Sequence, residues 1–240
     1  MHLASARFAG RKYRHDRYTR FPGRPGIRRG RASALNVGAI DSLDALRARY
    51  RAPGERARRK VIERLDVHCR TFIAHAPFLV IGTAAADGGP GDVSPRGDRP
   101  GFVHVVDDRT ILIPDRPGNN RLDTLTNILE NPEVSAIFMI PGFEETLRLN
   151  GRASLTDDPA LLEDLAMGGK PALIAIRVAV REAYIHCNRA LRRARLWDEA
   201  SKPDRGILPG GGRMVHEMAG LAGDPEEADR TYNEGTRKLY

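Results

Sequence analysis

The sequence predicts a mainly β fold in which six strands form a small closed or nearly closed barrel with peripheral helices. Three observations support this fold class. Apolar runs of strand length recur between residues 78 and 187, short turns rich in Gly, Pro, Asn and Asp separate them, and only short helical patterns interrupt the series. With 240 residues and 41% hydrophobic content, the chain can bury one good-sized core.

Six runs are rich in β-branched and apolar residues and are bounded by turn residues, so we expect each of them to be a strand. They cover residues 78–84, 102–106, 110–114, 134–140, 146–155 and 172–187. In the fifth run Leu147 and Leu149 alternate with polar residues, which is the period-two pattern of a half-buried strand. Residues 107–109 join the second and third runs through a connection short enough for a hairpin.

Apolar residues at helical spacing mark the segments between and around these strands. We expect helices over residues 42–50, 55–76, 121–131, 158–165, 190–197 and 214–222. The longest of them, 55–76, carries an apolar stripe that includes Ile62, Leu65 and Cys69. Pro77 follows this stripe and ends the helix.

The composition divides the chain into three regions. Residues 1–37 form a basic N-terminal extension that we expect to be disordered, because it is rich in Gly, Pro and Arg and lacks apolar periodicity. Residues 38–200 form the barrel domain with its N-terminal helices. Residues 201–240 form a C-terminal extension, rich in Gly and Pro, with a short helix.

The formal net charge of +8 belongs almost entirely to the N-terminal extension. Residues 1–31 hold ten of the 39 basic residues and one of the 31 acidic residues, so the remainder holds 29 bases and 30 acids. Because this segment interleaves Tyr13, Tyr18 and Phe21 with arginine, an RNA-binding arm is the alternative to plain disorder. We expect no nucleic-acid partner for the rest of the chain, since its charges balance.

Several absences from the sequence bound the cellular context. No run of 18 apolar residues could span a membrane, and the N-terminal residues hold no apolar core of a secretory leader. Two cysteines, Cys69 and Cys187, are too few for a disulfide framework. We therefore expect a cytoplasmic, reduced protein without a membrane partner.

Two strand ends carry residues suited to an anionic phosphate. SPRGD, residues 94–98, contributes one arginine, and PDRPGNNR, residues 114–121, contributes two arginines just before a predicted helix. The free N–H groups and partial positive charge at a helix start favour phosphate, and guanidinium groups add charge-assisted hydrogen bonds. The alternative is that Asn119 or Asn120 only caps the helix and that the arginines are solvated.

Other site motifs are absent or incomplete. The chain has no GxxxxGK[ST] phosphate loop, and GGPGDVS, residues 88–94, lacks the third glycine and the following helix of a dinucleotide fold. His68-Cys69 and His186-Cys187 offer four potential zinc ligands, but adjacent side chains diverge and no C-x₂-C spacing occurs, so we expect no metal site. The chain has no Gly-x-Ser-x-Gly elbow, and we name no catalytic residue.

The two strand-end motifs and the strands around them resemble the pyridoxamine 5′-phosphate oxidase-like flavoproteins, and more narrowly an uncharacterised branch that carries SPRGD and IPDRPGNNR. YIHCNRALRRARLW, residues 184–197, is similar to the same branch. The resemblance covers residues 41–197 and extends more weakly to the C-terminus. It implies a six-stranded split β-barrel that forms a homodimer and binds FMN in a groove between the subunits.

The resemblance also implies which residues bind the cofactor. The residues on the phosphate side are Ser94, Pro95, Arg96, Gly97, Pro114, Asp115, Arg116, Asn119, Asn120 and Arg121. The candidates for the ring or substrate side are Arg148, Arg192, Arg195 and Trp197. The dianionic phosphate of FMN would explain why arginines gather on a body with almost no net charge.

The function that the resemblance implies is that of an FMN-dependent oxidoreductase with a small-molecule substrate. The flavin performs the redox step, so no side chain need act as an acid or a base. The chain ends in NEGTRKLY and lacks the Arg-x-His motif of true pyridoxamine phosphate oxidases, which argues against vitamin B6 phosphate as the substrate. The alternatives are a deazaflavin-dependent reductase on the same barrel and a non-enzymatic flavin-binding protein.

Overall fold

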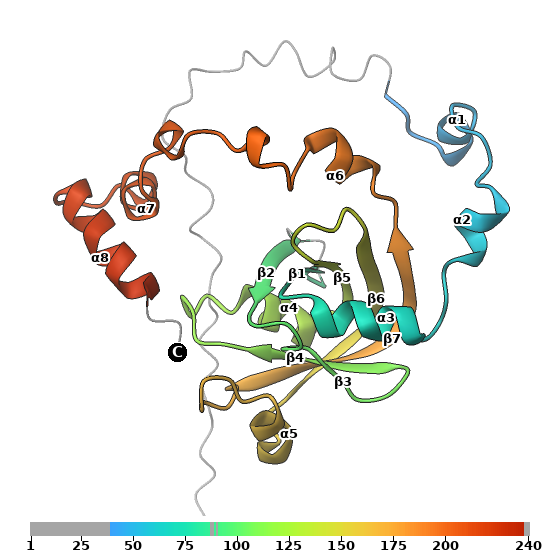
Figure 1. Ribbon diagram of the computed structural model, residues 1–240, viewed down its shortest axis with the longest axis horizontal. Helices are drawn as coiled ribbons and strands as arrows, with labels where there is room; N and C mark the ends of the chain where they lie inside the picture. Colours follow the sequence, from blue (N-terminus) through green and yellow to red (C-terminus); the bar gives the residue numbers. More distant parts are fainter. Residues whose placement is uncertain (1–38, 87–88, 90, 238–240) are drawn as a thin grey trace, which may run out of the picture. The chain divides into compact units, whose positions relative to one another are not determined.

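The computed structural model describes residues 39–86, 89 and 91–237 (Figure 1). The chain divides into two units, residues 1–53 and 54–240. In the first unit the structure describes helix α1 (Leu43–Arg47), where the Ser42 hydroxyl accepts a hydrogen bond from the Ala45 N–H at 3.2 Å. The predicted disordered extension, residues 1–37, and its alternative role as an RNA-binding arm lie outside the described residues.

Within the described residues of the second unit, seven strands form one antiparallel sheet. The strands are β1 (Phe78–Thr83), β2 (Asp92–Gly97), β3 (His104–Val105), β4 (Thr110–Asp115), β5 (Glu133–Met139), β6 (Thr146–Thr156) and β7 (Ile174–His186). Their order across the sheet is β2-β1-β5-β6-β7-β4-β3. The predicted class, mainly β with peripheral helices, is confirmed as a half-barrel sheet, and the predicted number of six strands is corrected to seven.

The additional strand is β2, which contains most of the SPRGD motif. Its Pro95 pairs in register with Val80 of β1, and no other described strand lies on its far side. Proline lacks an N–H group, so it fits a strand mainly at a sheet edge, where one side of the backbone needs no partner. The segment was not among the six predicted strands, and the structure shows it as an edge strand.

The core lies between the curved sheet and two helices, α3 (Val67–His75) and α4 (Asp123–Glu130). Figure 1 shows both helices lying across the sheet. Ile73 of α3 and Ile128 of α4 are buried in the same apolar cluster as the inward-facing residues of the strands. The predicted alternation in β6 is confirmed, because Leu147 and Leu149 are both fully buried.

The other helices of the described chain are short or peripheral. They are α2 (Glu55–Arg59), α5 (Pro159–Asp164), α6 (Arg189–Ala194), α7 (Gly211–Ala219) and α8 (Pro225–Arg237), with 3-10 turns at Glu199–Ser201 and Arg205–Ile207. In α5 the Asp158 carboxylate accepts a hydrogen bond from the Ala160 N–H at 2.9 Å and proline occupies the first turn. Leu162 and Leu165 form a second, smaller apolar cluster with Leu112 of β4.

The predicted single helix over 55–76 is wrong in its middle. Between α2 and α3, Ile62 exchanges two backbone hydrogen bonds with Ala183 of β7, at 3.0 and 2.8 Å. Asp66 then caps α3, because its carboxylate accepts a hydrogen bond from the Cys69 N–H at 2.8 Å. The apolar stripe that suggested one helix is thus shared between a β-bridge and a shorter helix.

The C-terminal extension holds two helices, α7 and α8, where one short helix was predicted. They pack closely against each other, and a Cβ atom at Gly212 would lie only 2.5 Å from the Ala228 carbonyl oxygen. Glycine is needed there for close approach of the two backbones. The glycine-rich sequence suggested a loop, but it forms the start of a packed helix.

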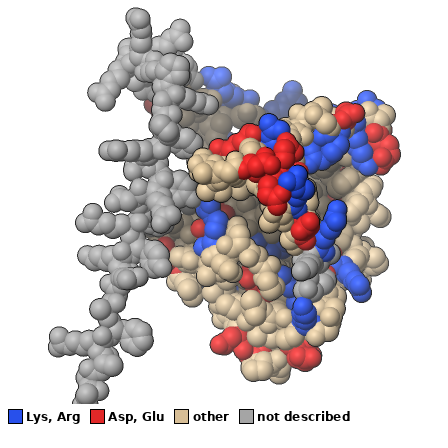
Figure 2. Space-filling model, turned by 90° about the vertical axis from the view of Figure 1, so that its left-hand side faces the viewer, with Lys and Arg blue, Asp and Glu red and all other residues tan. Residues whose placement is uncertain are grey.

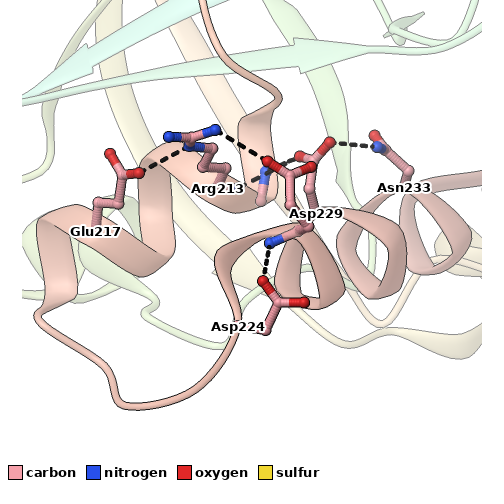
Figure 3. A network of polar contacts seen from close by, with 7 residues as sticks. Arg213, Glu217, Asp224, Asp229 and Asn233 are labelled. Atoms are coloured by element: carbon pink, nitrogen blue, oxygen red, sulfur yellow. Dashed lines mark hydrogen bonds and ion pairs between the residues drawn. The ribbon is translucent and has the colours of Figure 1, made fainter.

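A polar network fastens α7 to α8 (Figure 3). The Arg213 guanidinium pairs with Glu217 at 2.8 Å within α7 and with Glu226 at 2.9 Å in α8. The Asp229 carboxylate accepts a hydrogen bond from the Arg213 N–H at 3.3 Å and another from Asn233 Nδ2 at 3.1 Å. Acceptors from α8 thus satisfy donors at the start of α7, which has no side-chain cap of its own.

Charges of both signs are spread over the described surface. Figure 2 shows basic and acidic side chains interspersed on the face that it presents. This mixture agrees with the near balance of acids and bases beyond residue 31. Among the described helices, none is both long and apolar enough to cross a membrane.

Candidate functional site

A cavity of about 660 Å³ lies between β2, the end of β4 and the start of α4. Its lining includes all ten residues that were predicted for the phosphate side. These are Ser94, Pro95, Arg96, Gly97, Pro114, Asp115, Arg116, Asn119, Asn120 and Arg121. Two motifs that are separate in the chain therefore meet at one cavity.

Two ion pairs at this cavity join the edge strand β2 to β4, the strand next to the opposite edge of the sheet. β2 and β4 are not hydrogen-bonded neighbours, yet Arg96 Nη2 on β2 lies 3.4 Å from Asp115 Oδ1 at the end of β4. Just beyond the two strands, Asp98 Oδ2 lies 3.3 Å from Arg116 Nε. The arginine of SPRGD thus pairs with the aspartate of PDRPGNNR, and the aspartate of SPRGD pairs with the first arginine of PDRPGNNR. This crossed arrangement links the two strands.

The Arg96 side chain is held mainly by its own strand. Its Nη1 donates hydrogen bonds to the Ser94 hydroxyl at 2.8 Å and to the Pro95 carbonyl at 2.9 Å. Its Nε is buried and has no hydrogen-bond partner. A buried donor without a partner costs free energy, so a bound anion that reached Nε would be stabilised.

Arg116 and Asp98 form the more buried of the two pairs. The Asp98 side chain is 1% exposed and that of Arg116 is 16% exposed. Arg116 Nη2 also donates a hydrogen bond to the Leu165 carbonyl at 2.8 Å. Because a buried charge is tolerated only when it is paired and hydrogen-bonded, Arg116 holds the fold together as well as lining the cavity.

The loop between β4 and α4 differs from the sequence prediction. Helix α4 begins at Asp123, two residues after the predicted start at Arg121, and Leu122 rather than Asn119 or Asn120 occupies the N-cap position. The Asn119 side-chain oxygen instead accepts a hydrogen bond from the Arg121 N–H at 3.1 Å, which is a local turn of the kind that asparagine favours. Asn120 and Leu122 have φ values of 58° and 59°, so the backbone enters the left-handed region twice before the helix begins.

The start of α4 is accessible from the cavity. Leu122 occupies the position before the helix and offers no side-chain oxygen, so it makes no side-chain capping hydrogen bond to the first turn. The first-turn residues Asp123, Thr124 and Leu125 all line the cavity. N–H groups at a helix start attract anions. Arg121, whose side chain is 58% exposed, lies beside them with Nε 2.8 Å from Asp123 Oδ2.

Carboxylates balance the arginines of the cavity. The lining holds three arginines and three aspartates, the latter being Asp92, Asp115 and Asp123. Asp92 Oδ2 accepts a hydrogen bond from the Thr124 hydroxyl at 2.6 Å. Burial raises the pKa of Asp115 above its ordinary value, and the neighbouring Arg96 guanidinium opposes that rise. Burial thus disfavours the charged form of Asp115.

The four residues predicted for the ring or substrate side do not line this cavity. These four are Arg148, Arg192, Arg195 and Trp197. Two of them, Arg148 and Arg195, contact residues of their own region. Arg148 on β6 lies over the Tyr184 ring, with Cζ 5.4 Å from the ring centroid, and Lys60 Nζ lies 5.3 Å from the same centroid. Arg195 Nε donates a hydrogen bond to Asp198 Oδ2 at 2.9 Å.

The other two of these residues gather at the turn between β5 and β6. Arg192 Nε lies 2.9 Å from Glu144 Oε2. Trp197 Nε1 donates a hydrogen bond to the Phe143 carbonyl at 2.7 Å. Within one chain, these four residues are therefore separate from the cavity of the two phosphate motifs.

The cavity has further lining residues that the sequence reasoning missed. Phe102, Leu125, Leu173 and Ile174 add apolar surface to it, and Asp92 stands at the start of β2. Asp92 lies two residues before the SPRGD motif and could have been included from its position in the sequence. Phe102 and Leu125 each lie four residues after one of the motifs. Leu173 and Ile174 come from a distant segment, and it is the pairing of β4 with β7 that brings them to the cavity.

The histidine–cysteine pairs of the sequence do not form a metal site. Cys69 is buried in the core, where burial raises the pKa of its thiol to about 11, and Cys187 is exposed. In residues 39–86, 89 and 91–237, no group of three or more His, Cys, Asp or Glu side chains could hold a metal ion.

Solved structures show partial similarity to the chain. A HupZ variant from Group A Streptococcus is 16% identical, covers 51% of this chain and 99% of its own, and has a TM-score of 0.41. A Clostridium acetobutylicum protein of the pyridoxinephosphate oxidase family, related to general stress protein 26, is 12% identical with coverages of 50% and 86% and a TM-score of 0.38. An FMN-binding protein from Syntrophomonas wolfei is 12% identical with coverages of 49% and 88% and a TM-score of 0.37. No curated protein sequence matches the chain.

A family model gives the assignment. The model for pyridoxamine 5′-phosphate oxidase matches residues 65–187, which is about half of the chain. The matched span contains both strand-end motifs and every residue that lines the cavity. This protein therefore belongs to the pyridoxamine 5′-phosphate oxidase family.

Proposed function

We propose that the protein binds FMN through this cavity and is an FMN-dependent oxidoreductase acting on a small molecule. The observation that carries the proposal is the meeting of both phosphate-suited motifs at one cavity in a member of this family. Its volume of about 660 Å³ falls within the range usual for small-molecule sites.

The phosphate is held by two arginines and by the first turn of α4. Arg121 is largely exposed, and Arg96 has a buried Nε with no hydrogen-bond partner. The first turn of α4 adds backbone N–H groups and the positive end of the helix dipole. Arg116 contributes positive charge nearby, while its hydrogen bonds stay with Asp98 and Leu165.

The chain's own residues bind and orient the cofactor, and the bound flavin supplies the redox chemistry. Phe102, Leu125 and Ile174 offer apolar surface beside the phosphate-binding groups, which suits a ligand with an anionic tail and an apolar ring. No side chain is assigned as an acid or a base. The substrate that this proposal requires is a small molecule that reaches the flavin ring.

We further propose that the protein works as a homodimer with FMN between the subunits. The four residues of the ring or substrate side make contacts away from the cavity within one chain. Across a dimer interface they reach the ring or the substrate. Sedimentation of the protein with and without FMN tests this part, and a monomeric FMN complex would contradict it.

Titration of the purified protein with FMN, riboflavin and a deazaflavin cofactor tests the proposed function. We expect FMN to bind with the yellow absorbance of a bound flavin, and riboflavin, which lacks the phosphate, to bind at least about tenfold more weakly. If the deazaflavin bound more tightly than FMN, the same site would instead belong to a deazaflavin-dependent reductase. Binding of FMN without reduction by any electron donor would make the protein a flavin carrier.

A further inference from the structure

Asp115 stands where a bound phosphate would compete with it. Its carboxylate lies 3.4 Å from Arg96 Nη2, both side chains are 17% exposed, and both residues line the cavity. Arg96 also carries the buried Nε that has no hydrogen-bond partner. A phosphate that satisfies this guanidinium must therefore approach the Asp115 carboxylate.

We propose that Asp115 takes up a proton when a phosphate-bearing ligand binds to Arg96, so that cofactor binding is coupled to protonation of this carboxyl group. The inference rests on the proposed function, because it requires a phosphate in the cavity. Before binding, the Asp115 carboxylate supplies the negative charge next to Arg96. After binding, the phosphate supplies that charge and Asp115 is neutral.

The proton balance of this step is simple. One O–H bond forms on the Asp115 carboxyl group, the proton comes from solvent, and Arg96 remains a cation throughout. No electron moves, and no covalent bond to the ligand forms or breaks. The protonated carboxyl group can then donate a hydrogen bond to a phosphate oxygen, whereas the carboxylate would repel it.

Two effects act on Asp115 in the same direction. Burial already disfavours its charged form and raises its pKa, with Arg96 opposing the rise. A phosphate beside Arg96 brings further negative charge close to the carboxylate and offsets the Arg96 charge that had favoured ionisation. Both effects favour proton uptake in the complex.

The other charged groups around the cavity are already paired. They are Arg116, Arg121, Asp92, Asp98 and Asp123. Arg116 pairs with Asp98, and Arg121 with Asp123. Asp92 accepts the hydrogen bond from the Thr124 hydroxyl. Of the three arginines in the cavity lining, Arg96 is the one in an ion pair with Asp115, so a phosphate acts on Asp115 through Arg96.

Isothermal titration with FMN measures the proton uptake. The heat of binding is compared in buffers of different ionisation enthalpy, from about pH 5 to pH 8, for the unsubstituted protein and for Asp115→Asn. The phosphate of FMN titrates in the same pH range and is coupled to residue 115, so phosphorus-31 NMR follows its proton change in each complex. Subtracting that change from the total uptake isolates Asp115. Asp107→Asn is the matched control, because Asp107 lies in the β3–β4 turn outside the cavity lining.

We expect the unsubstituted protein and Asp107→Asn to take up a larger fraction of a proton than Asp115→Asn, with a maximum difference that approaches one. The affinity of the unsubstituted protein then falls with rising pH by up to about tenfold per pH unit relative to Asp115→Asn. Equal proton uptake by all three proteins, with FMN bound to each, would overturn the inference and leave the proposed function standing. Failure of the unsubstituted protein to bind FMN would overturn both.

A second measurement keeps the inference testable if Asp115→Asn does not fold. Carbon-13 NMR of the aspartate carboxyl groups in the unsubstituted protein follows the titration of Asp115 with and without FMN. The inference requires the pKa of Asp115 to rise when FMN binds. An unchanged or lowered pKa in the FMN complex would contradict it.

Discussion

The Arg116 guanidinium and the Asp98 carboxylate form a buried ion pair across the split between β2 and β4, with Nε 3.3 Å from Oδ2. The Asp98 side chain is 1% exposed, so its removal leaves a largely buried guanidinium without its counter-charge. We expect Asp98→Asn to lower the free energy of unfolding by about 3 kcal/mol, measured by urea denaturation.

The matched control for this pair is Asp123→Asn. Asp123 also pairs with an arginine, but its side chain is 47% exposed and that of Arg121 is 58% exposed. Exposed pairs contribute little, so we expect a loss of less than about 1 kcal/mol. Equal losses in the two variants would show that burial does not distinguish the pairs and would contradict the structural role of Asp98.

Arg121 should affect ligand affinity more than stability. We expect Arg121→Ala to weaken FMN binding about ten- to a hundredfold, because a charge-assisted hydrogen bond to phosphate is lost. The unfolding midpoint should change little, since the Arg121 side chain is 58% exposed. A fluorescence titration with FMN and a thermal melt provide the two readouts.

Arg152→Ala is the control for Arg121. Arg152 is likewise an exposed arginine in an ion pair, with Glu133, but it does not line the cavity. Its removal should leave FMN affinity unchanged. If both variants bound FMN equally well, Arg121 would have no part in holding the phosphate.

The packing of α7 on α8 depends on the absence of a side chain at residue 212. Gly212→Ala would bring a methyl group to 2.5 Å from the Ala228 carbonyl oxygen and 2.6 Å from the Asp229 Cα atom. Because both neighbours are backbone, we expect the helices to separate and hydrogen exchange in residues 211–237 to accelerate.

Gly235 within α8 offers the opposite case. A Cβ atom there would meet no atom within 4 Å. Alanine is a better helix former than glycine, so Gly235→Ala should slow hydrogen exchange in α8, by a stabilisation of up to about 1 kcal/mol. Similar exchange in the two variants would contradict the close packing at Gly212.

Cys69 should be unreactive in the folded protein. Its thiol has a pKa raised to about 11 by burial, and a thiol reacts as its thiolate. A disulfide reagent at neutral pH should therefore modify Cys187, which is exposed, and reach Cys69 only after unfolding. Rapid modification of both cysteines in the native protein would contradict the burial of Cys69.

The same pKa predicts a loss of stability in alkali. Because the folded-state pKa of Cys69 lies above its ordinary value of 9.0, the stabilising effect of the protonated thiol is complete below about pH 9 and is lost as the pH rises toward 11. Urea denaturation at several pH values measures this. Cys69→Ala should reduce the decline over this interval.

The mainly β fold and most strands could be predicted from the local sequence, because a half-buried strand alternates apolar and polar residues along its own length. Leu147 and Leu149 of β6 show this directly. β2 could not be assigned because Pro95 normally argues against a strand, and its place at a sheet edge depends on the strand order. The break after α2 likewise depends on Ile62 meeting Ala183 of a strand far along the chain.

The two sequence motifs named residues that meet at one cavity, but they did not reveal how those residues pair. The motifs named Arg96, Arg116 and Arg121 as cations for a phosphate, and all three line one cavity. The crossed pairs with Asp98 and Asp115 arise only when the sheet brings β2 and β4 together. The spacing of residues along the sequence does not show that these two strands lie close together. Arg116 was therefore predicted to bind the ligand, and its ion pair with Asp98 was not predicted.

A crystal structure of the FMN complex tests the central claim most directly. The account predicts that the FMN phosphate lies in the cavity between β2 and α4, within hydrogen-bonding distance of the Arg96 and Arg121 guanidinium groups and of the first-turn N–H groups of α4. A phosphate bound away from this cavity, with Arg96 still paired to Asp115 as in the present structure, would contradict the account.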